Sequence, residues 1–229
     1  MGDHITLKAS DGFDLDVYRA MPQGEPVGAI IVLQEIFGVN SHIRSVADLY
    51  ATQGYVAYAP ALFDRAQKHV EAGYSPEDVN AGVALVGRVP QDKTLLDVQA
   101  TIDHAMTHTS QDGACKVGVV GYCWGGSLAY AASAMLNNVS AAVGYYGGNI
   151  AGMLDHKPRA PLILFFGGKD DYIPPADIEK IKHANPTVPV TVYETTGHGF
   201  NCDQRGSYDK PSADDARAKA FAFFKQHIG

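Results

Sequence analysis

Residues 117–126 read V-G-V-V-G-Y-C-W-G-G, a short β-branched run that ends in a glycine-flanked cysteine. The apolar run is too short for a buried helix and favours a strand, whereas the alanine-rich residues 128–135 favour a helix. Cys123 is therefore expected on a tight turn between a strand and a helix. In the pattern Gly-x-nucleophile-x-Gly, the glycines allow the strand and the helix to approach closely around a strained residue.

A thiol on such a turn lies at a helix N-terminus, where backbone N–H groups and the helix dipole favour a thiolate. We interpret Cys123 as a candidate nucleophile. The alternative is a structural cysteine beside glycines that serve packing. The chain has two further cysteines, Cys115 and Cys202. An odd, small number of cysteines argues against a disulfide framework and for free, reduced thiols.

Composition limits the class of protein. The chain has 229 residues, of which 46% are hydrophobic and 19% charged, and this predicts one globular α/β domain over residues 1–229. Acidic residues exceed basic ones by 25 to 18, so the net charge of -7 disfavours nucleic acid and anionic membranes as partners. No apolar run spans a bilayer and residues 1–20 do not resemble a signal peptide. We expect a cytoplasmic monomer or weak dimer.

Apolar runs and helix signals alternate along the rest of the chain. An edge hairpin is expected over residues 5–9 and 15–20, and further strands over 27–33, 55–59, 140–146, 161–166 and 188–193. Helices are predicted over residues 42–53, 76–86, 91–108, 176–184 and 212–227, with a turn at Asp112-Gly113. This alternation predicts a mostly parallel central sheet with helices on both faces.

Polar groups follow four of the expected strands, namely Glu35, Cys123, Asp170 and His198. In an open parallel sheet, functional groups gather at the carboxyl ends of the strands. The chain order of nucleophile, acid and histidine is the order expected for an α/β-hydrolase. A thiol must lose a proton to attack a carbonyl, an imidazole must transfer protons, and a carboxylate must orient the imidazole.

The acid could be Asp170 or Asp171, and we prefer Asp170 because of its spacing to Ile173-Pro174. Either aspartate could instead be a turn former, which is the common role of loop aspartates. His198 lies between two glycines in T-G-H-G-F, residues 196–200. Taken alone, a loop histidine is usually solvated, but its place after the turn and the aspartate predicts a catalytic role.

Glu35 ends an apolar strand, so burial would raise its pKa and make it a proton acceptor near neutrality. The alternative is a structural carboxylate that bonds to the backbone. The N–H of Ile36 could pair with the N–H of Trp124 as an oxyanion hole, because such holes use the residue after the nucleophile and one from an early loop.

Five motifs together resemble the dienelactone hydrolase family: Q-E-I-F-G-V-N at 34–40, G-Y-C-W-G-G at 121–126, G-Y-Y-G at 144–147, G-G-K-D before I-P at 167–174, and G-H-G-F at 197–200. The resemblance implies an α/β-hydrolase fold with a triad of Cys123, His198 and Asp170. It also implies that Glu35 deprotonates the cysteine when substrate binds, and that the Ile36 and Trp124 amides hold the oxyanion. The implied activity is hydrolysis of a lactone in chloroaromatic catabolism, without metal or organic cofactor.

The substrate-binding residues depart from that family. Members that cleave dienelactone resemble each other in having arginines that bind the substrate carboxylate, one of them four residues after the histidine. This chain has Cys202 at that position. Arg205 is close enough to replace it, but residues 76–88 have no early arginine to match the second. A lost carboxylate clamp weakens binding of an anionic lactone. Tyr145 is a further candidate for the pocket lining.

We therefore predict a hydrolase of small carboxylic esters or lactones that acts through an acyl-thiol intermediate. A thioesterase or a peptidase could use the same triad, and a ligand binder or thiol redox sensor could keep the fold without catalysis. His104 and His108 share a predicted helix face but lack the glutamate of a zinc protease helix, so no metal site is expected there.

Overall fold

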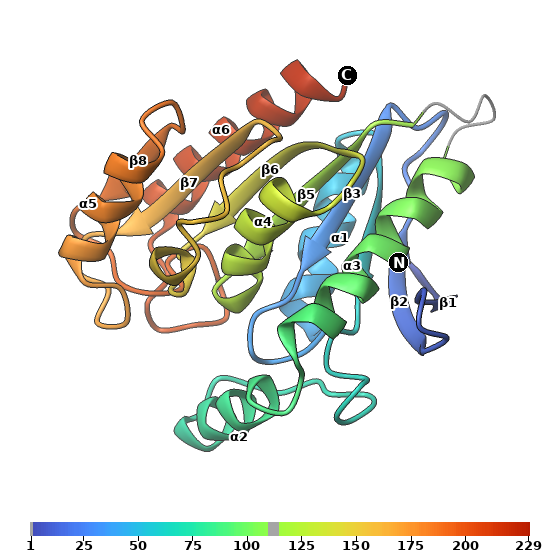
Figure 1. The fold of residues 1–229 in the computed structure, drawn as a ribbon, viewed down its shortest axis with the longest axis horizontal. Helices are drawn as coiled ribbons and strands as arrows, with labels where there is room; N and C mark the ends of the chain where they lie inside the picture. The colour runs from blue at the N-terminus through green and yellow to red at the C-terminus, as the bar shows by residue number, and fades with distance from the viewer. Residues whose placement is uncertain (1, 110–114) are drawn as a thin grey trace.

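A computed structural model describes residues 2–109 and 115–229. Within them one eight-stranded sheet has the order β1-β2-β4-β3-β5-β6-β7-β8 (Figure 1). The strands are β1 (Asp3–Lys8), β2 (Asp14–Ala20), β3 (Gly28–Leu33), β4 (Tyr55–Pro60), β5 (Val117–Tyr122), β6 (Val139–Tyr145), β7 (Leu162–Gly167) and β8 (Val190–Tyr193). The β1–β2 and β2–β4 pairs are antiparallel, and all other pairs are parallel.

Helices cover both faces of this sheet. They are α1 (Ser41–Thr52), α2 (Pro76–Val86), α3 (Gln91–His108), α4 (Trp124–Met135), α5 (Pro175–Ala184) and α6 (Lys210–His227), with a short 3-10 turn η1 at Ile150–Gly152. Figure 1 shows α3 and α4 in front of the sheet and α1 and α6 behind it. The ring of Tyr50 on α1 packs against Phe221 and Phe224 of α6. Helix α2 lies apart from both layers, beyond the carboxyl ends of the strands.

The predicted elements and the mostly parallel sheet are confirmed, with shifts of a few residues at their ends. The largest shift is in α4, which begins at Trp124 although residues 125 and 126 are glycines. Glycine disfavours a helix intrinsically, but a Cβ on Gly126 would lie 2.3 Å from the carbonyl oxygen of Tyr145. Tertiary packing therefore overrides local propensity there. The expected Asp112-Gly113 turn lies outside the described residues, and the single-domain organisation stays a prediction.

The core lies where strands are covered on both faces. Every residue of β3, β4, β5 and β7 is buried, which explains why these strands are nearly continuous apolar runs. The edge strand β8 is only half-buried. No helix within the described ranges is long and apolar enough to cross a membrane.

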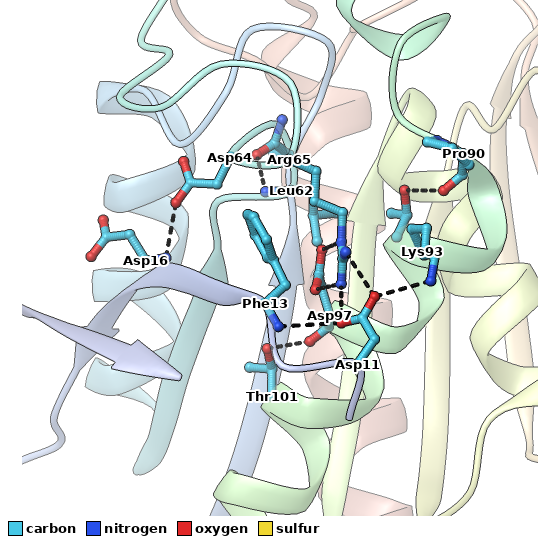
Figure 2. Close-up of polar contacts among 12 residues, drawn as sticks. Asp11, Phe13, Asp16, Leu62, Asp64, Arg65, Pro90, Lys93, Asp97 and Thr101 are labelled. Atoms are coloured by element: carbon cyan, nitrogen blue, oxygen red, sulfur yellow. Dashed lines mark hydrogen bonds and ion pairs between the residues drawn. The ribbon is translucent and has the colours of Figure 1, made fainter. Parts of the chain in front are cut away.

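A partly buried ion cluster connects the hairpin, the loop after β4 and helix α3 (Figure 2). Arg65 donates two hydrogen bonds to Asp97, at 2.7 and 2.8 Å, and two to Asp11, both at 3.0 Å. Lys93 adds a third donor to Asp11 at 3.1 Å. Burial raises the pKa of Asp97, and the Arg65 guanidinium partly offsets this effect. The cluster anchors the start of the segment that leads to α2.

Replacement of Arg65 by alanine is expected to lower the free energy of unfolding by about 3 kcal/mol, because the fully buried Asp97 loses its counter-ion. Urea denaturation measures this loss. Lys93→Ala is the control: its side chain is 42% exposed, so a change of about 1 kcal/mol or less is expected. An Arg65→Ala midpoint equal to that of Lys93→Ala would show that the Arg65–Asp97 pair contributes no special stability.

Candidate active site

Cys123 lies on a sterically strained turn between β5 and α4. Its backbone has φ +56° and ψ −116°, a region that side chains other than glycine rarely adopt. A Cβ on Gly121 would lie 1.8 Å from the carbonyl oxygen of Gly125, and a Cβ on Gly125 would lie 2.3 Å from that of Leu33. Both glycines are therefore required for the turn, as the sequence pattern predicts.

His198 is held by Asp170, which lies behind its ring. The Nδ1 of His198 is 2.7 Å from Oδ2 of Asp170, and Oδ1 of Asp170 accepts the backbone N–H of Tyr172 at 2.9 Å. Asp170 is buried, whereas Asp171 is exposed. The structure therefore brings Asp170, and not Asp171, to the histidine. The rings of Tyr146 and Tyr172 flank His198, with centroids 5.0 and 5.1 Å from its own.

The charge of His198 depends on both neighbours. Burial lowers the pKa of His198, but hydrogen bonds with Asp170 and Cys123 and the charges of both groups raise it to about 10. Cys123 and His198 line the same cavity, so the thiol and the imidazole open into one space.

Glu35 lies two residues beyond β3 and is fully buried. Its Oε1 accepts a hydrogen bond from Nη1 of Arg205 at 3.2 Å, while its Oε2 has no hydrogen-bond partner among the described residues. The Arg205 guanidinium also lies over the rings of Phe37 and Tyr74. A Cβ on Gly199, whose φ is +77°, would lie 2.7 Å from Nη1 of Arg205, so this glycine lets the arginine cross to Glu35.

The candidate oxyanion-hole residues lie beside Cys123. Ile36 and Trp124 line the same cavity as Cys123 and His198. No hydrogen bond from the N–H of Ile36 or Trp124 to a described residue is present, so both donors are free for an oxyanion. The Trp124 ring stacks on Phe63 at 5.1 Å, which fixes the residue next to the thiol.

The cavity at the thiol has a volume of about 250 Å³ and is mostly apolar. Helix α2 contributes Val79, Val83 and Val86, and Arg205 also reaches the lining. Sequence reasoning predicted α2 but did not place its valines in the pocket. Their spacing of i, i+4 and i+7 marks one helix face and is the signal that could have found them. Tyr172, which also lines the cavity, had no such signal.

The expectation that Tyr145 lines the pocket is wrong. Its ring is 1% exposed and packs between Tyr122 and Phe165, with centroids 4.7 and 4.9 Å away, and it is absent from the cavity lining. Tyr145 is the last residue of β6, so its side chain is part of the core between sheet and helices. Its carbonyl oxygen instead accepts the N–H of Cys123 at 3.0 Å.

Cys202 is buried and does not line the cavity. Its Sγ lies 3.2 Å from the Tyr74 hydroxyl, and burial raises the pKa of the thiol to about 11. Cys202 is therefore a neutral thiol that cannot replace an arginine at a substrate carboxylate. Arg205, which pairs with Glu35, is the cation that reaches this part of the site.

The mostly parallel sheet, the strained turn after β5 and the order of Cys123, Asp170 and His198 define an α/β-hydrolase fold. The dienelactone hydrolase family model matches residues 15–228. The chain belongs to the dienelactone hydrolase family and is a carboxymethylenebutenolidase-like hydrolase.

Individual relatives agree with this assignment. The chain is 38% identical over 213 residues to a Synechocystis sp. protein named "Putative carboxymethylenebutenolidase", covering 87% of this chain and 86% of that one. It is 30% identical to carboxymethylenebutenolidase from Pseudomonas putida, covering 96% and 94% of the two chains. A crystal structure of "Putative Dienelactone Hydrolase" from Klebsiella pneumoniae superposes with a TM-score of 0.85 at 30% identity, covering 99% and 98%.

Proposed function

We propose that the protein hydrolyses small carboxylic esters or lactones through an acyl-thiol intermediate on Cys123. The observation that carries this proposal is the pair of Asp170 and His198 at 2.7 Å, with the ring in the same cavity as a thiol on a strained turn. The thiol also opens into an apolar cavity, where charges that develop during the reaction are poorly screened.

In acylation, the Cys123 thiolate attacks the carbonyl carbon, and the N–H groups of Ile36 and Trp124 stabilise the resulting oxyanion. The protonated His198 then donates its proton to the leaving alkoxide, and the carbon–oxygen bond breaks. The Cys123 thiol must lose its proton before it attacks, and Glu35 is our candidate for the acceptor because its buried Oε2 has no hydrogen-bond partner among the described residues.

In deacylation, His198 changes its role. Acylation removes the hydrogen bond and the negative charge of Cys123, two of the causes that raise the pKa of His198. The pKa of the ring then falls, so His198 can accept a proton from water, and the resulting hydroxide attacks the thioester; the carbon–sulfur bond then breaks, which releases the carboxylic acid and restores the Cys123 thiolate. Asp170 keeps the ring in one orientation throughout both steps.

The lining of the cavity favours a neutral substrate whose apolar group packs against α2. The valines of α2 offer no hydrogen bond, and the positive charge of Arg205 is offset by Glu35. A substrate carboxylate would have to compete with Glu35 for Arg205, so a lactone that carries a carboxylate is expected to bind more weakly.

A substrate panel tests this proposal. We expect short-chain p-nitrophenyl esters to be hydrolysed with a higher kcat/KM than acyl-CoA, peptides or dienelactone. A clear preference for acyl-CoA or for peptides would replace the proposed activity by a thioesterase or a peptidase. Absence of turnover on the whole panel, with no acyl adduct by intact-mass spectrometry, would favour a ligand binder or a redox sensor.

Glu35→Gln is expected to slow acylation by about 100-fold and to change deacylation by only a few-fold, because the amide cannot accept the thiol proton. The Gln oxygen can still accept the hydrogen bond from Arg205. Stopped-flow traces of p-nitrophenol release separate the burst, which reports acylation, from the steady state. Glu179→Gln, whose side chain is 69% exposed on α5, is the control. Equal slowing of both phases would count against Glu35 as the proton acceptor.

We also propose that the protein is a cytoplasmic monomer or weak dimer without nucleic acid or membrane partners. The net charge of -7 and the free thiols of Cys115, Cys123 and Cys202 support this proposal. Sedimentation velocity at several concentrations tests the oligomeric state, and a tight higher oligomer would contradict it.

A further inference from the structure

Three buried side chains of metal-ligand type meet behind the candidate site. A carboxylate oxygen of Glu35, a ring nitrogen of His42 and the Sγ of Cys202 all lie within 4.8 Å of one another. Glu35 and Cys202 are fully buried, and His42 is 3% exposed. They come from the end of β3, the start of α1 and the loop after His198. Local sequence gives no sign of this cluster, because Cys202 is distant along the chain.

Several polar atoms of this region have no hydrogen-bond partner among the described residues. They are Oε2 of Glu35, both ring nitrogens of His42 and Oδ1 of Asn201. Buried polar atoms are paired in about 90% of cases or more, so a group of unpaired polar atoms needs an explanation such as an ion. Carboxylate, imidazole and thiolate together form a ligand set that suits Zn²⁺.

We propose that Glu35, His42 and Cys202 form a Zn²⁺ site and that the bound ion inhibits hydrolysis by occupying Glu35. The proposal that zinc binds depends only on the geometry of the cluster, whereas the proposal that zinc inhibits hydrolysis rests on the proposed function of Glu35. On binding, the S–H bond of Cys202 breaks, a Zn–S bond forms and the proton leaves to solvent. No electron is transferred.

The geometry requires only small movements. Tetrahedral zinc with bonds of about 2.0–2.3 Å places its ligand atoms roughly 3.3–3.8 Å apart, so the ligand atoms, which now lie within 4.8 Å of one another, must approach by at most about 1.5 Å. Nδ1 of His42 lies 3.5 Å from Oδ1 of Asp203, which leaves Nε2 as the ligand atom. A slight approach of Asp203 on zinc binding would give Nδ1–H the carboxylate partner that commonly orients a metal-bound histidine. Water or Oδ1 of Asn201 would complete the coordination.

His42, but neither Glu35 nor Cys202, lines a cavity other than the substrate cavity. A second cavity of about 220 Å³ is lined by His42, Asn201 and Asp203 together with residues of α1 and α6. No described residue lines both cavities. Zinc would therefore reach the cluster from the α1–α6 side of the sheet while the thiol side stays open to substrate.

Zinc binding is measured best without the active-site thiol, so the full chain with Cys123→Ala is treated with EDTA and titrated with ZnCl₂ against a chromogenic chelator. One ion per chain is expected, and X-ray absorption should show one sulfur ligand beside nitrogen and oxygen. Adding Cys202→Ser should weaken binding by more than about 100-fold, because even a lost second-shell contact costs 10- to 100-fold. Adding Cys115→Ser, a buried cysteine outside the cluster, should leave the affinity unchanged.

His42→Gln in the same background tests the site a second time, and circular dichroism confirms that each variant is folded. Absence of stoichiometric binding, or affinity unaffected by both Cys202→Ser and His42→Gln, would overturn the metal site.

For the inhibitory part, zinc should lower the activity of the wild-type protein at least tenfold, and this ratio of activities without and with zinc should fall to near one in Cys202→Ser. Stoichiometric binding without inhibition would overturn that part. Because binding is read in a variant without the thiol, its outcome is independent of whether Cys123 is the nucleophile.

Discussion

Replacement of Cys123 by alanine is expected to lower the turnover of p-nitrophenyl esters by at least about 10⁴-fold. Removal of a nucleophile in a comparable triad costs up to about 10⁶-fold, and the residual rate comes from the oxyanion hole and from binding. The effect should be one of chemistry and not of folding, because the Cys123 side chain is only half-buried and alanine fits the same space. Steady-state rates and the melting temperature separate the two.

Cys115→Ala is the matched control, because it removes a second free thiol that does not line the cavity. Its turnover should stay within about twofold of the wild-type protein. Intact-mass spectrometry after mixing with ester should show one acyl group on the wild-type chain and none on Cys123→Ala. Undiminished ester cleavage by Cys123→Ala would refute the nucleophile and the acyl-thiol intermediate together.

Asp170→Asn has the second largest expected effect, a loss of about 10⁴-fold in kcat. Asp170 accepts two hydrogen bonds, from Nδ1–H of His198 and from the N–H of Tyr172. An asparagine has only one oxygen for these two donors. If that oxygen stays on Tyr172, the amide N–H₂ faces the ring and forces Nδ1 to accept, so the proton moves to Nε2. Nε2 then cannot accept the proton of water.

The pH profile gives a second readout of the same substitution. The folded pKa of His198 is raised above its ordinary value, so the ring is protonated at low pH and loses its proton as the pH rises through about 10. The hydrogen bond with Asp170 is one cause of this rise. We therefore expect the alkaline limb of kcat/KM, which reports loss of the general acid, to move to lower pH in Asp170→Asn.

Asp171→Asn is the control for Asp170→Asn, because the neighbouring carboxylate is exposed and makes no hydrogen bond to His198 among the described residues, whereas Asp170 does. It should change kcat by less than about twofold, as most surface substitutions do not disturb a site. If Asp171→Asn were as damaging as Asp170→Asn, the acid of the triad would be wrongly assigned.

Much of the architecture was predictable because it depends on local physics. The unbroken apolar run of β3 marks a strand covered on both faces, and the glycines around Cys123 mark a turn that a Cβ would block. The order of Cys123, Asp170 and His198 places three strand ends at one edge of a parallel sheet. These features follow from the periodicity of apolar residues, from steric limits on the backbone and from the order of strands and helices, all of which can be inferred from the sequence.

Other features of the site depend on contacts between residues that are far apart along the chain. Arg205 reaches Glu35, Cys202 turns away from the cavity toward Tyr74, and Tyr145 faces the core. The path of a loop decides each of these orientations. Neither the periodicity of apolar residues nor secondary-structure propensity specifies the path of a loop. The sequence by itself determined which residues reach the carboxyl edge of the sheet. Only the tertiary structure decided which side chains meet there, because burial and pairing arise when the whole chain packs.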